Sequence, residues 1–218
     1  MGYNVAIDGP AGAGKSTIAK LVAKQKGYIY VDTGALYRGL SVHFLDAGIS
    51  PEDTEGIIEA AKSADVTIQY EDGAQQVYLN GKNITERLRE EIVGKMASVS
   101  SAIPEVRARL LALQQNIAKE KDVIMDGRDI GTCVLPDADV KVFLTAGAKT
   151  RAKRRYDELM EKGIACDLAE IEKDIRDRDE RDMTRETAPL RQAEDAVLID
   201  SSHMSIDEVA AAIVALCK

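Results

Sequence analysis

A short glycine-rich segment near the start of the chain restricts its fold more than any other feature. Residues 9–16 read GPAGAGKS, which matches the pattern GxxxxGK[ST] at every fixed position. The run Asn4–Asp8 before it is rich in strand-forming residues, and a helical pattern begins at about Lys15. A strand, this loop and a helix in that order are typical of a P-loop, whose small residues let consecutive backbone N–H groups surround a phosphate. We therefore expect the chain to bind a nucleoside triphosphate.

Each part of the loop has a chemical reason. The N-terminus of the following helix adds a positive dipole, Lys15 is expected to reach the β- and γ-phosphates, and the Ser16 hydroxyl can ligate Mg²⁺. The alternative is a glycine-rich turn that binds nothing, but a Lys–Ser pair after the last glycine then has no role. The expected ATP-binding residues of the loop are Gly9, Pro10, Ala11, Gly12, Ala13, Gly14, Lys15, Ser16 and Thr17.

The rest of the chain alternates short apolar runs with helical patterns. Several of the runs are bounded by Asp residues, as expected of strands buried on both faces. The predicted strands are 4–8, 28–31, 123–125, 140–144 and 196–199, and the predicted helices are about 15–26, 34–47, 51–63, 89–100, 104–120, 148–162, 167–186 and 205–218. This order predicts an α/β domain with a five-stranded parallel sheet and helices on both faces.

One region follows a different pattern. Residues 66–70 and 76–79 alternate apolar and polar side chains, and the turn signals Glu71–Asp72–Gly73 and Asn80–Gly81 follow them. We predict a small antiparallel meander over about 65–85, inserted into the α/β domain. Upstream, Ser50-Pro51 predicts a helix with Pro51 at its first position. For the last helix, Ser205 with Glu208 three residues on predicts a capping box at its start.

Composition limits the function. The chain has 218 residues with a formal net charge of −8, which argues against a general nucleic-acid binder. No apolar run approaches the ~18 to 20 residues of a membrane span, and the N-terminus lacks the features of a signal peptide. The three cysteines form no CxxC pair, which favours reduced thiols in a cytoplasmic protein. His43 and His203 stand alone, so no metal-ligand cluster is expected.

Three further segments carry charged residues suited to a second substrate. DTGALYR (32–38) and DGRDIGT (126–132) each follow a predicted strand, at the sheet edge where open parallel sheets bind ligands. Their alternatives are a helix cap at Thr33, a surface arginine at Arg38 and a tight polar loop. The third segment is 176–185, where we expect Arg178, Asp182 and Arg185 to share one helix face.

The third segment also has an ordinary interpretation, as a solvated helix held by weak ion pairs. Its arginine content argues against this, because eight of the 14 arginines lie within 151–191. Arginine forks match phosphate oxygens, whereas lysine serves solubility equally well.

The four segments together resemble bacterial-type cytidylate kinases, over essentially the whole chain. The most specific matches are IDGPAGAGKST (7–17), DTGALYR (32–38), DGRDIGT (126–132) and RDRDERDMTRETAPL (176–190). The resemblance implies a single P-loop kinase domain over 1–218, a monophosphate-binding insertion at 39–103 that carries the antiparallel sheet, and a helical lid at 148–187. It also implies a monomer.

The resemblance further implies roles for individual residues. Arg38, Arg128 and Arg185 correspond to ligands of the CMP α-phosphate and, with Lys15, form the catalytic group. Ser98, Arg107 and Asp129 correspond to readers of cytosine, and Arg178 and Asp182 to pentose contacts. Thr33, Tyr37 and Gly127 complete the expected CMP-binding set, although Tyr37 fits a core position equally well. The lid arginines Arg151, Arg154 and Arg155 are expected to approach the triphosphate on closure.

The expected reaction is Mg²⁺-dependent transfer of the ATP γ-phosphoryl group to CMP or dCMP, with no nucleic-acid or membrane partner. Ser16 is the expected Mg²⁺ ligand, and either Asp32 or Asp126 supports the ion from behind.

Two alternatives remain: another small P-loop kinase, of the shikimate, gluconate or dephospho-coenzyme A type, or a non-enzymatic nucleotide-dependent regulator. A switch GTPase is disfavoured because no Asn/Thr-Lys-x-Asp motif is present. Cys133 is expected to be a buried apolar side chain rather than a reactive thiol.

Overall fold

The computed structural model describes residues 2–218 and divides into two compact units. Unit 1 comprises Gly2 with Ile29–Val123, and unit 2 comprises Tyr3–Tyr28 with Ile124–Lys218. Within the described residues, no helix combines the length and the apolar character needed to cross a membrane.

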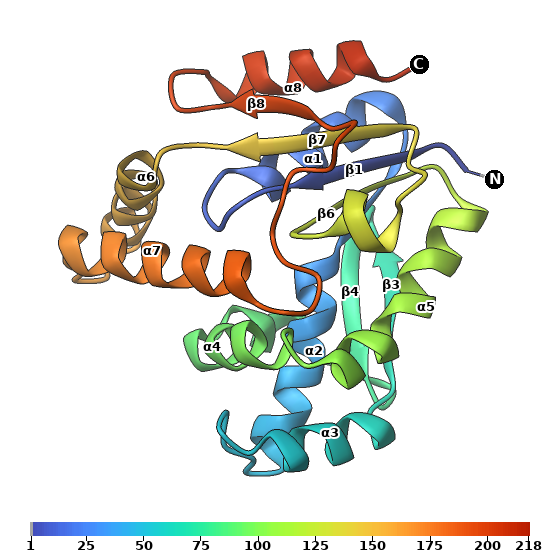
Figure 1. The fold of residues 1–218 in the computed structure, drawn as a ribbon, viewed down its shortest axis with the longest axis vertical. Coiled ribbons are helices and arrows are strands. Elements are labelled where there is room, and N and C mark those ends of the chain that lie inside the picture. The colour runs from blue at the N-terminus through green and yellow to red at the C-terminus, as the bar shows by residue number, and fades with distance from the viewer. Residues whose placement is uncertain (1) are drawn as a thin grey trace. The chain divides into compact units, whose positions relative to one another are not determined.

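A five-stranded sheet has the strand order β2-β6-β1-β7-β8 (Figure 1), and its number of strands is the one that the sequence predicts. The strands are β1 (Asn4–Asp8), β2 (Ile29–Asp32), β6 (Val123–Gly127), β7 (Val140–Thr145) and β8 (Val197–Asp200). β1 pairs with β7 in parallel, with Val5 opposite Val140, and β7 pairs with β8 in parallel. Every residue of β1 is buried, which explains its apolar sequence.

The last strand corrects one expectation. β8 was expected to be buried on both faces, yet Val197 and Leu198 are 43% and 56% exposed. The reason is its place in the sheet: β8 is an edge strand with β7 as its one neighbour. An apolar run alone does not distinguish an edge strand from a central strand.

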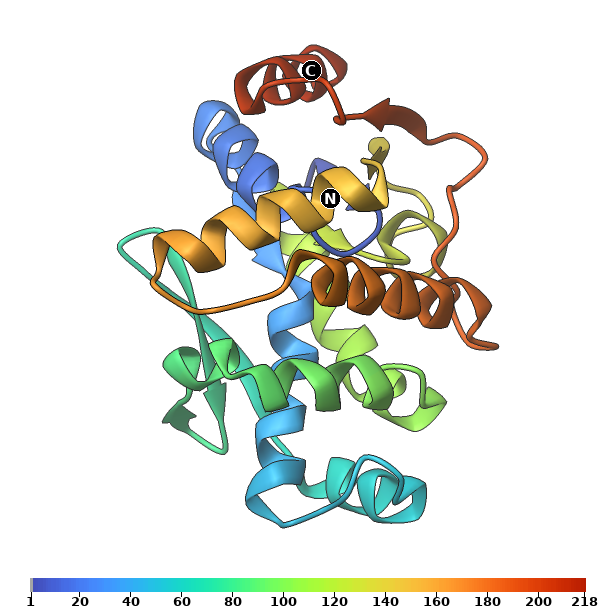
Figure 2. The same ribbon diagram turned by 90° about the vertical axis from the view of Figure 1, so that its left-hand side faces the viewer.

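The helices of unit 2 form two groups. α1 (Lys15–Lys26) packs against α8 (Ile206–Leu216), and α8 begins with the predicted capping box of Ser205 and Glu208. α6 (Ala148–Glu161) and α7 (Leu168–Thr184) pack against each other. They are drawn in gold and orange in Figure 2. A short π-helical turn at Ile130–Val134 follows β6.

Unit 1 is built around one helix. The apolar side chains of α2 (Thr33–Asp46), among them Leu36, Leu40 and Phe44, are buried in a core shared with other elements of the unit. Those elements are α3 (Thr54–Ser63), α4 (Glu91–Ser100), α5 (Pro104–Glu120), the 3-10 helix at Thr85–Arg89, and the strands β3 (Val66–Glu71), β4 (Ala74–Leu79) and β5 (Lys82–Asn83). The three strands form the predicted antiparallel meander.

Two helix starts differ from the sequence expectations. α3 begins at Thr54 rather than at Pro51, because Asp53 caps it by accepting from the Gly56 N–H at 2.9 Å. The preceding residues form a separate turn, closed by a bond from the Asp53 N–H to the Ser50 carbonyl. At α2 the cap is Asp32, which accepts from the Ala35 N–H, and Thr33 is the first helical residue.

Candidate active site

The P-loop connects β1 to α1 within unit 2, and two of its glycines are required by the backbone. A Cβ atom at Gly9 would lie 1.9 Å from the Leu144 carbonyl oxygen, so no larger residue fits there. Gly14 caps α1 in the left-handed region, with φ 89°. The loop therefore has the strand–loop–helix context that its sequence predicts, and the N-terminus of α1 offers the backbone N–H groups and the positive dipole that suit an anion.

Lys15 is the first residue of α1, and its side chain is 5% exposed. Its ammonium group donates to the Pro10 carbonyl at 2.8 Å. Burial lowers the pKa of Lys15 to about 7, and the neighbouring Arg128 and Arg178 act in the same direction. Asp126 and Asp8 oppose this shift. A polyanion beside this amine would favour its charged form, as expected of a phosphate-binding lysine.

Asp8, the last residue of β1, was not singled out from the sequence. Its carboxylate is 5% exposed and accepts two backbone N–H groups, from Ile130 and from Gly131, each at 2.7 Å. Burial raises the pKa of Asp8 to about 6, while the two backbone hydrogen bonds lower it. The available signal was an acid placed at the end of a buried strand, directly before the P-loop.

Oxygen atoms suited to Mg²⁺ lie beside the P-loop. The Ser16 hydroxyl donates to Asp126 Oδ2 at 3.0 Å, and Asp126 is buried at the end of β6. A hydroxyl and a carboxylate are ligands that Mg²⁺ prefers, so this pair fits the ion. Asp32 caps α2 with its Oδ1 instead. The contact with Ser16 favours Asp126 over Asp32 as the supporting acid, a choice that the sequence left open.

Two buried ion pairs join the segment after β6 to α7 and the residues that follow it. Arg128 Nε donates to Asp182 Oδ2 at 2.8 Å, and Arg185 Nη2 donates to Asp129 Oδ1 at 3.4 Å. Arginine and carboxylate groups that are removed from water need partners of opposite charge, and here each of the two arginines is paired with one carboxylate. Arg178, the remaining unit 2 arginine of the predicted CMP-binding set, is half-buried on α7.

The spacing of Arg178, Asp182 and Arg185 predicted that they share one helix face, but Arg185 does not lie on that face. α7 ends at Thr184, and Arg185 lies in the extended conformation just beyond it. The chain then folds back, because the Leu190 N–H donates to the Asp182 carbonyl at 2.7 Å and the Leu190 side chain is buried. This tertiary contact, absent from any helical pattern, moves Arg185 off the helix and beside Asp129.

The three lid arginines differ in their surroundings. Arg151 is 4% exposed and donates to Asp179 Oδ2 at 2.6 Å, to the Ala11 carbonyl at 2.9 Å and to the Ala146 carbonyl. Arg154 donates to the Ser201 carbonyl at 2.7 Å, and Arg155 pairs with Glu158. Arg151 thus links α6, α7 and the P-loop, while Arg154 and Arg155 are exposed.

A cavity of about 560 Å³ adjoins the P-loop and is lined by unit 2 residues alone. Its walls include P-loop residues 12–17 and the three lid arginines. The sequence did not predict a further part of the wall, which is formed by Ser201, Met204, Ser205, Ile206 and Val209. These residues have no chemical motif, and their place at the cavity depends on the packing of α8 against α1.

The five CMP-binding residues predicted in unit 1 lie on three of its helices. Thr33, Tyr37 and Arg38 belong to α2, Ser98 to α4 and Arg107 to α5. The Arg107 guanidinium lies over the Tyr37 ring, 5.5 Å from its centroid, and donates to the Ser101 carbonyl. Ser98 Oγ is buried and has no hydrogen-bond partner in the described part of the chain, which suits a group that awaits a ligand.

The other six predicted CMP-binding residues belong to unit 2. They are Gly127, Arg128, Asp129, Arg178, Asp182 and Arg185. The structure links Arg128 with Asp182 and Asp129 with Arg185, and the charges of Arg128 and Arg178 act on Lys15.

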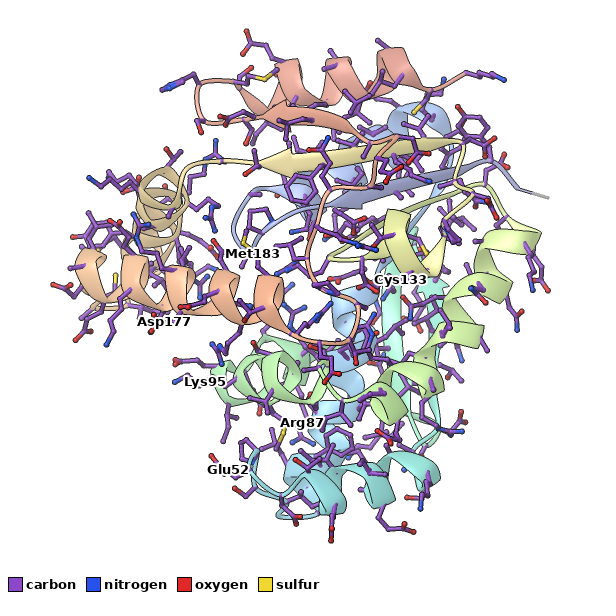
Figure 3. All side chains as sticks on the ribbon, viewed as in Figure 1. Glu52, Arg87, Lys95, Cys133, Asp177 and Met183 are labelled. Atoms are coloured by element: carbon purple, nitrogen blue, oxygen red, sulfur yellow. The ribbon has the colours of Figure 1, made fainter. Side chains whose placement is uncertain are left out.

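Cys133 is exposed, which corrects the expectation of a buried thiol (Figure 3). It lies on the π-helical turn after β6, where Ile130, Gly131 and Val134 take the buried positions. Cys166 is half-buried, Cys217 is buried, and all three thiols are free.

Comparisons with known proteins agree with this geometry. The family model described as cytidylate kinase matches residues 5–218. A cytidylate kinase of Caldicellulosiruptor bescii is 55% identical over 94% of this chain and 91% of its own length. A cytidylate kinase of Shouchella clausii is 46% identical over 100% of this chain and 96% of its own length. An uncharacterized protein of Eubacterium ventriosum, solved by crystallography, has a TM-score of 0.53 at 14% identity, covering 98% of this chain and 96% of that one, and shows a shared fold alone.

The parallel sheet, the P-loop and the buried lysine define an α/β protein of the P-loop kinase class. Within that class, the family match extends over nearly every residue of the chain. The chain belongs to the cytidylate kinase family.

Proposed function

We propose that this chain transfers the γ-phosphoryl group of ATP to CMP or dCMP, giving CDP or dCDP and ADP. The observation that carries the proposal is the group of charges beside the P-loop lysine. Lys15 is buried in the field of Arg128, and Arg128 is held by Asp182. A lysine and an arginine placed this close together suit two anionic groups that must be brought into contact despite their repulsion.

The transfer needs little covalent participation from the protein. The acceptor phosphate of CMP is largely ionised at neutral pH, so no general base is required. Catalysis then consists of holding donor and acceptor in line and stabilising the negative charge of the transferred group. We assign Lys15 to the β- and γ-phosphates and Arg38, Arg128 and Arg185 to the CMP phosphate.

Mg²⁺ would be held by Ser16, with Asp126 orienting the hydroxyl from behind. When bound, the ion supplies charge neutralisation at the β- and γ-phosphate oxygens. The backbone N–H groups of the P-loop and the N-terminus of α1 contribute fixed positive charge to the same phosphates.

The 560 Å³ cavity beside the P-loop suits the nucleoside part of ATP. Met204, Ile206 and Val209 give one wall an apolar character, and the exposed Arg154 and Arg155 lie on another.

We propose that α6 and α7, within 148–187, act as the lid, and that residues 39–103 help to hold the monophosphate. A closed lid would exclude water that otherwise hydrolyses ATP. We further propose a cytoplasmic monomer.

Cytosine recognition gives a prediction. Asp129 and Ser98 can accept from the exocyclic amine of cytosine, and Arg107 can donate to N3 and O2. Uracil reverses the donor and acceptor at this edge, which leaves buried groups unpaired at about 1–3 kcal/mol each. We therefore expect kcat/KM for UMP to be at least about 10-fold below that for CMP.

Ser98→Ala tests the same assignment, with Ser101→Ala as a matched control from the residue that follows α4. Ser98→Ala should reduce the ratio of kcat/KM for CMP to kcat/KM for UMP, and Ser101→Ala should leave this ratio unchanged. Equal kcat/KM values for CMP and UMP in the wild-type protein would refute the assignment of these three residues.

A coupled ADP-release assay tests the reaction class. CMP, dCMP, UMP, AMP, GMP, shikimate, gluconate and dephospho-coenzyme A are offered with Mg²⁺ and ATP. We expect the fastest ADP release with CMP and dCMP. Faster release with shikimate, gluconate or dephospho-coenzyme A would favour another small P-loop kinase, and ADP release independent of every acceptor would favour a nucleotide-dependent regulator.

A further inference from the structure

A buried carboxylate joins the strand that carries the P-loop to the loop that carries Arg128 and Asp129. Asp8 ends β1 and directly precedes Gly9, the first residue of the P-loop motif. Its two oxygens accept separate backbone N–H groups, Oδ1 from Ile130 and Oδ2 from Gly131, both at 2.7 Å. Charge-assisted bonds of this length to a buried carboxylate are among the stronger hydrogen bonds in proteins.

These two bonds hold the backbone where its conformation changes. Asp129 has φ −147° and ψ 26°, outside the regular strand and helix regions, and the π-helical turn starts at the next residue. Within that turn the Cys133 and Val134 N–H groups donate to the Asp129 carbonyl. Asp8 therefore contributes to fixing the direction in which the Arg128 and Asp129 side chains leave the loop.

The space around Asp8 is filled. A Cβ atom at Gly131 would lie 3.4 Å from Asp8 Oδ2 and 3.2 Å from the Lys141 side chain. The neighbouring charges are Asp129, which disfavours the ionised form of Asp8, and Lys15, which favours it. A buried carboxylate in this position costs folding free energy, so a site that keeps it has a use for its shape and charge.

We propose that Asp8 is a positioning residue that aligns the acceptor loop 127–131 with the phosphate-binding lysine. It touches neither substrate; it acts through the backbone at Ile130 and Gly131, and through its charge on Lys15. This inference rests on the proposed CMP site. It adds a link between the donor and acceptor halves of unit 2 that the residue pattern of the P-loop does not contain.

Asp8→Asn tests the link, because an amide keeps the size of the side chain but presents N–H₂ to one of the two backbone donors. We expect the dissociation constant for CMP, measured by calorimetry without ATP, to rise by about 10-fold. Hydrogen exchange at the Ile130 and Gly131 amides should become faster, and KM for ATP should rise less than KM for CMP.

Asp139→Asn is the matched control. Asp139 accepts the Asn4 N–H at 2.8 Å, so it holds the opposite end of the same strand. This variant should leave CMP binding unchanged. If both variants lower stability and affect CMP and ATP equally, Asp8 has only a structural role and the proposal is wrong.

Gly131→Ala gives a second approach should Asp8→Asn fail to fold. Its methyl group would contact the Asp8 carboxylate at 3.4 Å and press on the flexible Lys141 side chain at 3.2 Å. It should weaken CMP binding in the same direction but less. Unchanged CMP affinity in a folded Asp8→Asn protein, or in Gly131→Ala where Asp8→Asn is unfolded, overturns the proposal. A wild-type protein that binds no CMP refutes the proposed function, and the amide exchange then still reports on the Asp8 contact.

Discussion

Lys15→Met is expected to lower kcat by at least two orders of magnitude while the fold is preserved. The ammonium group of Lys15 is buried, and burial lowers its pKa to about 7, so an anion beside it would stabilise the charged form. Loss of one preorganised group that stabilises developing charge typically costs about 10²–10³ in kcat. Methionine keeps the aliphatic length of the side chain without its charge. Steady-state ADP release with saturating CMP and ATP measures the effect.

Lys24→Met is the control, because Lys24 is an exposed lysine on the same helix. It should leave both kcat and thermal stability close to those of the wild-type protein. The thermal midpoint of Lys15→Met should not fall much below that of the control, since the substitution removes a buried charge. Near-normal turnover in a folded Lys15→Met protein would show that this lysine does not act on the transferred phosphate.

Arg128→Met is the second change with a large expected effect. Arg128 is a predicted ligand of the CMP phosphate, and its charge acts on Lys15. Its Nε donates to the buried Asp182. Hydrogen bonds to charged groups contribute about 1.5–3 kcal/mol each, so losing an arginine fork should lower kcat/KM for CMP by about 100-fold. KM for ATP should change much less. Initial rates over a matrix of CMP and ATP concentrations separate the two effects.

Stability must be measured beside activity in this case. Removal of Arg128 leaves the Asp182 carboxylate buried without its partner, which typically destabilises a fold by about 3–5 kcal/mol. Arg128→Lys keeps the charge but not the fork, so it should fold better and retain an intermediate activity. Arg176→Met is the control, because Arg176 is an exposed residue of α7 paired with Glu172. A folded Arg128→Met protein with CMP kinetics within about 3-fold of the control would remove Arg128 from the phosphate site.

Local sequence signals predicted the strand and helix on either side of the P-loop well. The P-loop is formed by residues adjacent in the chain, and the strand before it and the helix after it have the predicted bounds, Asn4–Asp8 and Lys15–Lys26. The capping box at Ser205 was predicted for the same reason. In each case the deciding interactions span fewer than about five residues, which a sequence pattern can describe.

Contacts distant in sequence were beyond such patterns. Arg151 was expected to approach the triphosphate on closure, and no motif indicated that it would also be buried between Asp179 and the Ala11 carbonyl, where the packing of α6 on α7 places it. Arg185 lies off the helix because of the bond from Leu190 to Asp182. Asp8 became a candidate only when its two bonds to the loop after β6 were seen. These outcomes depend on how whole elements pack, which no motif records.

Product analysis by ³¹P NMR tests the central claim most directly. The protein is mixed with Mg²⁺, ATP and CMP, and the nucleotide phosphates are followed with time. Direct transfer predicts that CDP and ADP appear in equal amounts, that orthophosphate stays at the level of a protein-free sample, and that Lys15→Met slows the formation of both products at least about 100-fold. Orthophosphate and ADP without CDP, or CDP formation at a near-normal rate in Lys15→Met, would contradict the account.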